Sequence, residues 1–257
     1  MMHRTVTWIL IVCGALMSAP AFGAARGEAS SIEPRADKIL RQMTEYLKNL
    51  EQVSFHAENT GDRILDSGQK LQFARAVEVS VRRPNRFRAV VKGDLDNQQL
   101  SYDGKTITLF EPDRNYYATI KAPPNIDAAL DHALESFSLR APFSDLIYSN
   151  LYDILTENVV SGFYVGLHSV HGIETHHLAF RQDDIDWQVW IESSETPLPR
   201  KIIITEKRVA GAPQFTAVFS DWNVSPQLRD SVFTFVAPDK AERIEFLPVE
   251  KSAFPGQ

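Results

Sequence analysis

The stretch LQFARAVEVSVRRPNRF, residues 71–87, decides the fold of this chain. Positions 77, 79 and 81 are valines, whereas Glu78 and Ser80 lie between them. Alternation with a period of two is typical of a β-strand with one packed and one solvated face, because successive side chains point to opposite sides. Pro84-Asn85 ends this strand, because proline has no N–H to donate to a neighbouring strand. A second strand then starts at Phe87.

Short strands of the same style follow along the chain. Asp103-Gly104 separates two of them and is a strong signal for a β-hairpin. Strands are expected at residues 53–65, 71–83, 87–91, 98–102, 106–110, 116–121, 162–170, 174–181, 185–192, 201–207, 214–222 and 232–236. About eleven antiparallel strands in one sheet would curl rather than stay flat, which leaves a concave inner face.

Three segments have helical spacing of their apolar residues. They are residues 34–50, for which Ser31 is a candidate N-cap, residues 125–137, and residues 143–155, which are expected to be helical in two pieces. Helices that are segregated to the start and the middle of a run of strands indicate an α+β fold. The helices are the natural covers for the concave face.

The first residues have the pattern of a secretory signal peptide. His3 and Arg4 form a short positive region, an apolar run follows, and small residues up to Ala25 offer cleavage sites. Removal of residues 1–25 would leave one domain, residues 26–257, with a helical insert at about 125–155. We therefore expect a periplasmic protein.

Composition excludes several classes of protein. The 257-residue chain is 44% hydrophobic and 23% charged, which is ordinary globular usage. Its single cysteine, Cys13, falls in the expected signal peptide and excludes an intramolecular disulfide. A net charge of −6 without a basic run argues against nucleic-acid binding. No feature indicates an oligomer, so a monomer is expected.

No catalytic constellation is recognisable. Nucleophile-elbow, zinc-protease, phosphate-loop and dinucleotide motifs are all missing from the sequence. The best chemical cluster is His168, His171, His176 and His177, which could suggest zinc or copper. However, His171 lies in a predicted turn, and His176 and His177 fall on opposite faces of one strand, with His177 expected to face water. We therefore expect no metal, no cofactor and no enzymatic activity.

Three passages resemble the signatures of the periplasmic lipoprotein carrier LolA, in the same order: residues 81–87 (VRRPNRF), 102–107 (YDGKTI) and 233–238 (FTFVAP). The chain resembles more closely a family of exported bacterial proteins, DUF2092, through residues 176–182 (HHLAFRQ), 198–201 (LPRK) and 215–222 (FTAVFSDW). The likeness covers roughly residues 34–248.

The resemblance implies an incomplete β-barrel of about eleven antiparallel strands with helices over its open side. Alternation alone leaves two alternatives for Arg83, an inward side chain or one that reaches solvent. The resemblance favours the inward one, because the LolA arginine before Pro-Asn bonds to carbonyls of the covering helices and closes the empty cavity. The helical insert is larger than in LolA, and fold alone does not establish function.

We expect a binding or carrier protein for a lipid, a lipoprotein acyl chain or another hydrophobic ligand, with an inner- or outer-membrane protein as a candidate partner. An envelope sensor or interaction module is the alternative, and a metal-assisted hydrolase is a weaker one. Apart from Arg83, the residues expected to line the hollow are Phe73, Val77, Val79, Phe87, Ile107, Leu109, Trp187, Val189, Ile191, Phe215 and Phe219.

Overall fold

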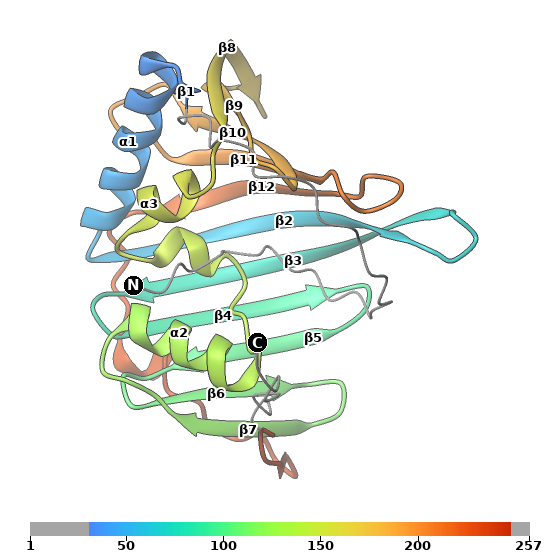
Figure 1. Cartoon of the computed structure of the whole chain (residues 1–257). Helices are drawn as coiled ribbons and strands as arrows, with labels where there is room; N and C mark the ends of the chain where they lie inside the picture. Colours follow the sequence, from blue (N-terminus) through green and yellow to red (C-terminus); the bar gives the residue numbers. More distant parts are fainter. Residues whose placement is uncertain (1–30, 248–257) are drawn as a thin grey trace, which may run out of the picture.

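The computed structural model describes residues 31–247, which form one sheet of thirteen strands (Figure 1). The strands are β1 (Ser31–Ile32), β2 (Gln52–Ile64), β3 (Lys70–Arg82), β4 (Arg86–Gly93), β5 (Asn97–Tyr102), β6 (Thr106–Glu111), β7 (Tyr116–Lys121), β8 (Ser161–Val170), β9 (Ile173–Arg181), β10 (Ile185–Glu192), β11 (Pro199–Glu206), β12 (Gln214–Asn223) and β13 (Glu242–Arg243).

The strand order is β1-β8-β9-β10-β11-β12-β2-β3-β4-β5-β6-β7-β13. The eleven strands from β2 to β12 pair antiparallel, and the two-residue strands β1 and β13 add parallel partners at the edges. The predicted curled antiparallel sheet of about eleven strands is therefore confirmed. The signal peptide expected at residues 1–25 lies outside the described residues.

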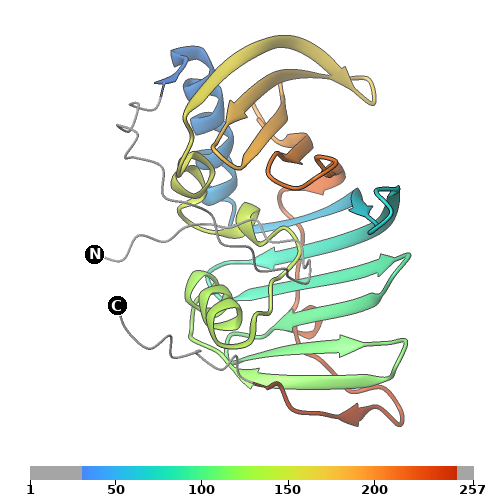
Figure 2. The same cartoon turned by 45° about the vertical axis from the view of Figure 1, so that its right-hand side comes forward.

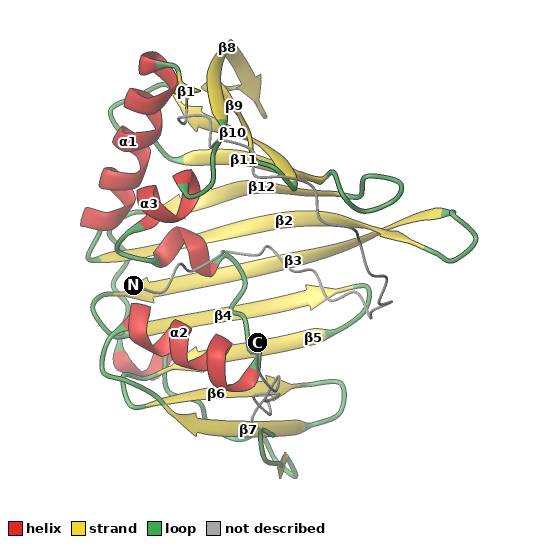
Figure 3. Cartoon of the chain, viewed as in Figure 1, coloured by secondary structure: helices red, strands yellow, loops and turns green. Residues whose placement is uncertain are grey.

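The strand order explains why helices lie across the sheet. The chain builds β2 to β7 outward from the middle, and it must then travel to the opposite edge before it can build β8 to β12 back toward β2. The segment that makes this journey contains α2 (Ile126–Phe137), η1 (Ser144–Ile147) and α3 (Leu151–Thr156). Together with α1 (Pro34–Asn49), these helices lie on one side of the sheet (Figures 2 and 3).

Helix boundaries follow from local chemistry. Pro34 starts α1, where its missing N–H costs no hydrogen bond. The Asn125 side chain caps α2 by accepting from the Ala128 N–H at 2.9 Å. The three predicted helical segments are confirmed, the last as the two pieces η1 and α3. Ser31 is not the cap of α1, because it belongs to β1.

The chain after β12 runs behind the sheet, on its convex side (Figure 2). The Arg82 guanidinium, which points outward, donates to the carbonyl oxygen of Leu228 at 2.8 Å. Phe233 is fully buried, and Phe235 packs on Phe110 and Tyr117 of the outer face. The strand predicted at residues 232–236 is therefore wrong. Their backbone follows a short 3₁₀ turn and pairs with none of the described strands, and their aromatic side chains pack on the outer face of the sheet.

His56 on the outer face of β2 gives a prediction for stability. Its ring nitrogens lie 2.7 Å from Glu78 Oε1 and 2.9 Å from Glu58 Oε1. Burial lowers the pKa of His56, but the hydrogen bonds and charges of Glu58 and Glu78 outweigh burial and raise it overall. A raised pKa stabilises the fold below the unfolded value of about 6.5, and this stabilisation is lost as pH rises through the folded value.

His56→Gln is therefore expected to lower the free energy of unfolding by roughly 0.5 kcal/mol at pH 5.5, the size of an exposed ion pair, and by less at pH 8.5. Urea unfolding at both pH values measures the difference. In a background with both glutamates changed to Gln, the pH-dependent part should vanish. An equal loss at both pH values would contradict the prediction.

Candidate ligand-binding face of the sheet

The residues predicted to line a hollow share the concave face of the sheet. Cross-strand pairing places them in rows, one of which runs through Val53, Val81, Phe87, Tyr102 and Ile107. Of the predicted residues, eight are buried and four are half-buried. The buried ones are Val77, Val79, Phe87, Ile107, Trp187, Val189, Ile191 and Phe219, and the half-buried ones are Phe73, Arg83, Leu109 and Phe215.

Side chains of the helices pack on this face. The buried side of α1 is formed by Ala36, Ile39, Leu40, Met43 and Leu47, and that of α2 by Ile126, Ala129, Leu130 and Ala133. These residues and the inward residues of the strands form one apolar cluster. In this state the helices cover the concave face directly.

Phe143, which is half-buried, links the helical segment to aromatic residues of the sheet. Its ring centroid lies 5.2 Å from that of Phe219, and 6.3 Å from those of Phe55 and Phe215. The backbone of Phe143 has φ +55°, a conformation that is costly for a bulky residue. The fold thus accepts backbone strain to place this ring on the concave face.

No signal in the sequence separates Phe143 from the other apolar residues of its segment. Phe55, in contrast, could have been found, because it has the same parity as Val53 and Ala57 in β2 and alternates with polar His56. It is 2% exposed and stacks on Trp222 with a centroid distance of 4.4 Å.

Arg83 points inward and reaches the helical segment. Its Nη1 donates to the carbonyl oxygen of Ile147 in η1 at 2.8 Å, so the predicted hydrogen bond to a covering helix is confirmed. Burial lowers the pKa of the Arg83 guanidinium, and the charge of Asp127 on α2 opposes this. Within residues 31–247 the buried Nε of Arg83 has no hydrogen-bond partner. The neighbouring Pro84 carbonyl accepts from the Ile126 N–H at 2.9 Å, so one loop holds both η1 and α2.

Side chains also link the helices of the insert to one another. Asp127 of α2 accepts from the Ser149 N–H at 3.2 Å and from the Ser149 hydroxyl. The Tyr148 hydroxyl donates to Asp131 Oδ1 at 2.9 Å. Consequently α2 and the turn between η1 and α3 are held together by hydrogen bonds that do not involve the sheet.

The end of the insert is attached to α1 through Tyr152. Arg41 Nη2 donates to the Tyr152 hydroxyl at 2.7 Å, and that hydroxyl donates to Asp37 Oδ1. The guanidinium carbon of Arg41 also lies 3.7 Å from the centre of the Tyr152 ring. Burial raises the pKa of Asp37, but the hydrogen bonds from Arg41 and Tyr152 outweigh it and lower the pKa overall.

Tyr152→Phe is expected to loosen α3 without unfolding the sheet, because it removes these hydrogen bonds and keeps the ring. A net hydrogen bond contributes about 1 kcal/mol, which corresponds to a roughly fivefold faster local opening. Hydrogen–deuterium exchange should show this acceleration in residues 151–157 and not in β3. Unchanged exchange of α3 would contradict the assignment of Tyr152 as its attachment.

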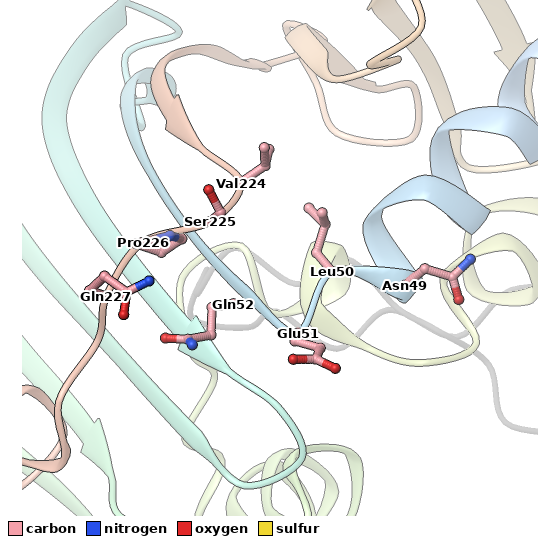
Figure 4. Close-up of a pocket in the computed structure, with 8 residues that line it drawn as sticks. All are labelled: Asn49, Leu50, Glu51, Gln52, Val224, Ser225, Pro226 and Gln227. Carbon is pink, nitrogen blue, oxygen red and sulfur yellow. The ribbon is translucent and has the colours of Figure 1, made fainter.

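Two surface pockets lie outside the apolar face. One of about 290 Å³ lies between the α1–β2 turn and the segment after β12, and it is lined by Asn49, Leu50, Glu51, Gln52, Val224, Ser225, Pro226 and Gln227 (Figure 4). The other, of about 150 Å³, lies between α1 and α3. Neither is lined by a residue predicted to bind the ligand, so the ligand-binding role of those residues stays a prediction.

The histidines are divided between the two faces, as predicted. His176 is opposite Ile191 on the concave face, and its Nδ1 lies 3.3 Å from the Tyr164 hydroxyl. His177 was expected to face water, and this prediction is wrong. It is 9% exposed and stacks on Trp190, with ring centroids 3.9 Å apart, because the outer face is aromatic there.

The nitrogens of His177 are both engaged. Its Nε2 lies 3.0 Å from Gln188 Oε1, and its Nδ1 lies 3.1 Å from His168 Nδ1. Burial lowers the pKa of His177, the hydrogen bond to Gln188 opposes this, and nearby His168 and Lys201 lower the pKa further, so that it is lowered overall. Between residues 31 and 247, no three His, Cys, Asp or Glu side chains are grouped so that they could hold a metal ion. The described helices include none with the length and apolar character needed to cross a membrane.

Comparison with solved structures finds distant likeness. An uncharacterized conserved protein from Thermus thermophilus is 11% identical, with a TM-score of 0.48, over 82% of this chain and 99% of that one. The lipoprotein LppX from Mycobacterium tuberculosis is 16% identical, with a TM-score of 0.47, over 77% and 100%. The LolA superfamily protein NE2245 from Nitrosomonas europaea is 13% identical, with a TM-score of 0.39, over 78% and 97%.

No curated protein sequence matches the chain. A family model does, over most of the residues that build the sheet and its covering helices. The match extends over residues 36–247, and the family is described as "Predicted periplasmic protein (DUF2092)", in agreement with the periplasmic location expected from the N-terminal residues. The chain therefore belongs to the DUF2092 family.

Proposed function

We propose that this protein binds a ligand with a long apolar chain, such as a lipid or a lipoprotein acyl chain, on the concave face of its sheet, and that it is a carrier and not an enzyme. The observation that carries the proposal is the pairing of an apolar sheet face with covering helices that are tied to it by a few polar contacts, above all Arg83 to Ile147.

Binding on this face requires the helices to move. Opening would move the helix side chains and Phe143 off the strands and expose apolar surface to water. The ligand would then bind in their place and bury part of that surface. Transfer of an acyl chain from water contributes roughly 0.8 kcal/mol per buried CH₂. A chain of about sixteen carbons therefore offers more than 10 kcal/mol against the cost of opening. No reacting group is needed for such a carrier.

The proposal is tested by native mass spectrometry of the protein purified from its own periplasm, followed by titration of the delipidated protein with a fluorescent fatty acid. We expect a co-purified lipid or acyl chain and saturable one-to-one binding. Protein that carries no ligand and takes up no apolar probe at micromolar concentration would overturn the proposal.

One observation favours an interaction module as a second candidate. Beyond the pairing of β1 with residues 161–162, the outer edge of β8 has no strand partner within the described part of the chain. Phe163, Val165 and Leu167 of this edge strand are 54%, 40% and 49% exposed. An exposed apolar edge suits strand addition by another chain. In the same mass spectra, a bound protein in place of a lipid would favour this candidate.

A further inference from the structure

A polar pair interrupts the apolar concave face away from the Arg83 contact. Asn59 of β2 and Arg75 of β3 are direct cross-strand neighbours, and they continue a row formed by Ala217 and Gly93 on either side. Asn59 is 3% exposed, and Arg75 is half-buried. Polar side chains at such positions need hydrogen-bond partners, because burying them unpaired costs free energy.

The single hydrogen bond within the pair leaves donors of both side chains unused. Arg75 Nε donates to Asn59 Oδ1 at 2.9 Å, which orients the amide so that its nitrogen points away from the guanidinium. The Asn59 Nδ2 is buried and has no hydrogen-bond partner among the described residues. Among the described residues the only side-chain hydrogen bond of Arg75 is the one from Nε, and its Nη groups are not fully buried, so they are open to water or to a ligand.

A glycine on the neighbouring strand leaves space for Arg75 on the concave face. A Cβ on Gly93 would lie 2.8 Å from the Arg75 Cβ, so only glycine lets the two strands present the arginine here without a shift. Burial lowers the pKa of Arg75, and the charge of Asp96 opposes this. The guanidinium is thus a partly desolvated cation, which interacts more strongly with an anion than a solvated one does.

The structure assigns a binding site for an oxyanion to Arg75 and Asn59, and we propose that it takes the carboxylate or phosphate head group of the amphiphile whose apolar chain lies on the same face. This inference rests on the proposed function and adds the class of ligand to it. The buried, unpaired Nδ2 of Asn59 beside the Arg75 cation suits a ligand group that accepts hydrogen bonds and carries negative charge.

The apolar stretch beside Arg75 is long enough for the chain once the helices have moved. Between Arg75 and Arg83, β3 presents Val77, Val79 and Val81 on the concave face, and all three are buried. At about 3.3 Å per residue, the two arginines are roughly 26 Å apart along the strand. One leaflet of a bilayer is about 15 Å of hydrocarbon, so an acyl chain anchored at Arg75 fits within this apolar stretch.

The test compares ligands that differ only in the head group. The delipidated protein is titrated with palmitate, with a phosphatidic acid and with hexadecanol, which has the chain but no charge. We expect at least one of the two anions to bind about tenfold more tightly than hexadecanol, and the two anionic arms tell a carboxylate site from a phosphate site. Raising NaCl from about 0.05 to about 0.5 M should reduce the preference.

Arg75→Met should remove the preference for the anion and leave hexadecanol binding unchanged, whereas Arg75→Lys should keep part of it. Asn59→Asp should also remove the preference for the anion, because the new carboxylate would form an ion pair with the Arg75 guanidinium and compete with the ligand. Arg88→Met is the matched control, since Arg88 lies on the outer face and donates to Gln99. The lysine variant keeps the test valid if the methionine variant does not fold.

The outcomes separate this inference from the proposed function. Equal binding of both anions and hexadecanol, or an anion preference that survives Arg75→Met, would overturn the oxyanion site and leave the carrier intact. A failure of all three ligands to bind would overturn both.

Discussion

Arg83→Leu is expected to bind an apolar ligand roughly tenfold more tightly than the unchanged protein and to release it correspondingly more slowly. The substitution removes the bond from Arg83 Nη1 to the Ile147 carbonyl, which exists in the covered state. A hydrogen bond to a charged group contributes about 1.5–3 kcal/mol, and at least the lower value would be removed from the cost of opening. Apparent ligand affinity is proportional to the fraction of protein in the open, binding-competent state. A lower free-energy cost of opening raises that fraction and therefore strengthens binding.

The same substitution should change the free energy of unfolding by less than about 1 kcal/mol, because leucine also removes a buried cation whose Nε is unpaired within the described residues. Fluorescent fatty-acid titration and stopped-flow dissociation measure the two ligand effects. Arg88→Leu makes the same change in charge on the outer face and should alter neither. Unchanged release by Arg83→Leu would remove Arg83 from the mechanism.

Phe143→Ala is expected to lower the free energy of unfolding by about 2–3 kcal/mol and at the same time to increase affinity for an apolar ligand. The ring packs against Phe55, Phe215 and Phe219, so its removal leaves unfilled apolar space on the concave face. A ligand chain that fills this space no longer has to displace the ring. Opposite changes in stability and affinity are the signature of a side chain that occupies the ligand's place.

Phe137→Ala is the matched control in the same insert. The ring of Phe137 packs on His132 and Phe246, and among the described residues no ring contact joins it to Phe143 or to the phenylalanines that Phe143 contacts. Its removal should therefore destabilise the protein without strengthening binding. Urea unfolding and fatty-acid titration of both variants make the comparison. If Phe143→Ala weakens binding, the ring is part of the ligand site and does not exclude the ligand.

Much of the sheet could be predicted because its information is local. The alternation of residues 77–81 assigns the valines to one face, and Asp103-Gly104 turns the chain with Gly104 at φ +86°. Both features depend on neighbours a few residues apart. The same alternation fails at residues 232–236, where apolar side chains pack behind the sheet without pairing their backbone.

The contacts between side chains on neighbouring strands could not be predicted in the same way. Alternation states that His177 and Trp190 fall on the outer face of their strands, but not that they stack there and bury each other. It also leaves Asn59 as one polar residue on an apolar face, with no indication that its cross-strand neighbour is a cation. Pairing between strands creates those contacts.

The period of side chains along single segments was enough to predict most of the antiparallel strands with their faces and the positions of the helices, but it left both an inward and a solvent-exposed side chain open for Arg83. Three contacts of the site emerge only in the folded chain: Arg83 with the carbonyl of Ile147, Phe143 with the concave phenylalanines, and Arg75 with Asn59. They join residues far apart in the sequence. The first two arise because the segment from β7 to β8 must cross the sheet, and the third arises from the register of β2 and β3. Periodicity within one segment carries no information about where the segment between β7 and β8 packs on the sheet, or about which residues of β2 and β3 are cross-strand neighbours.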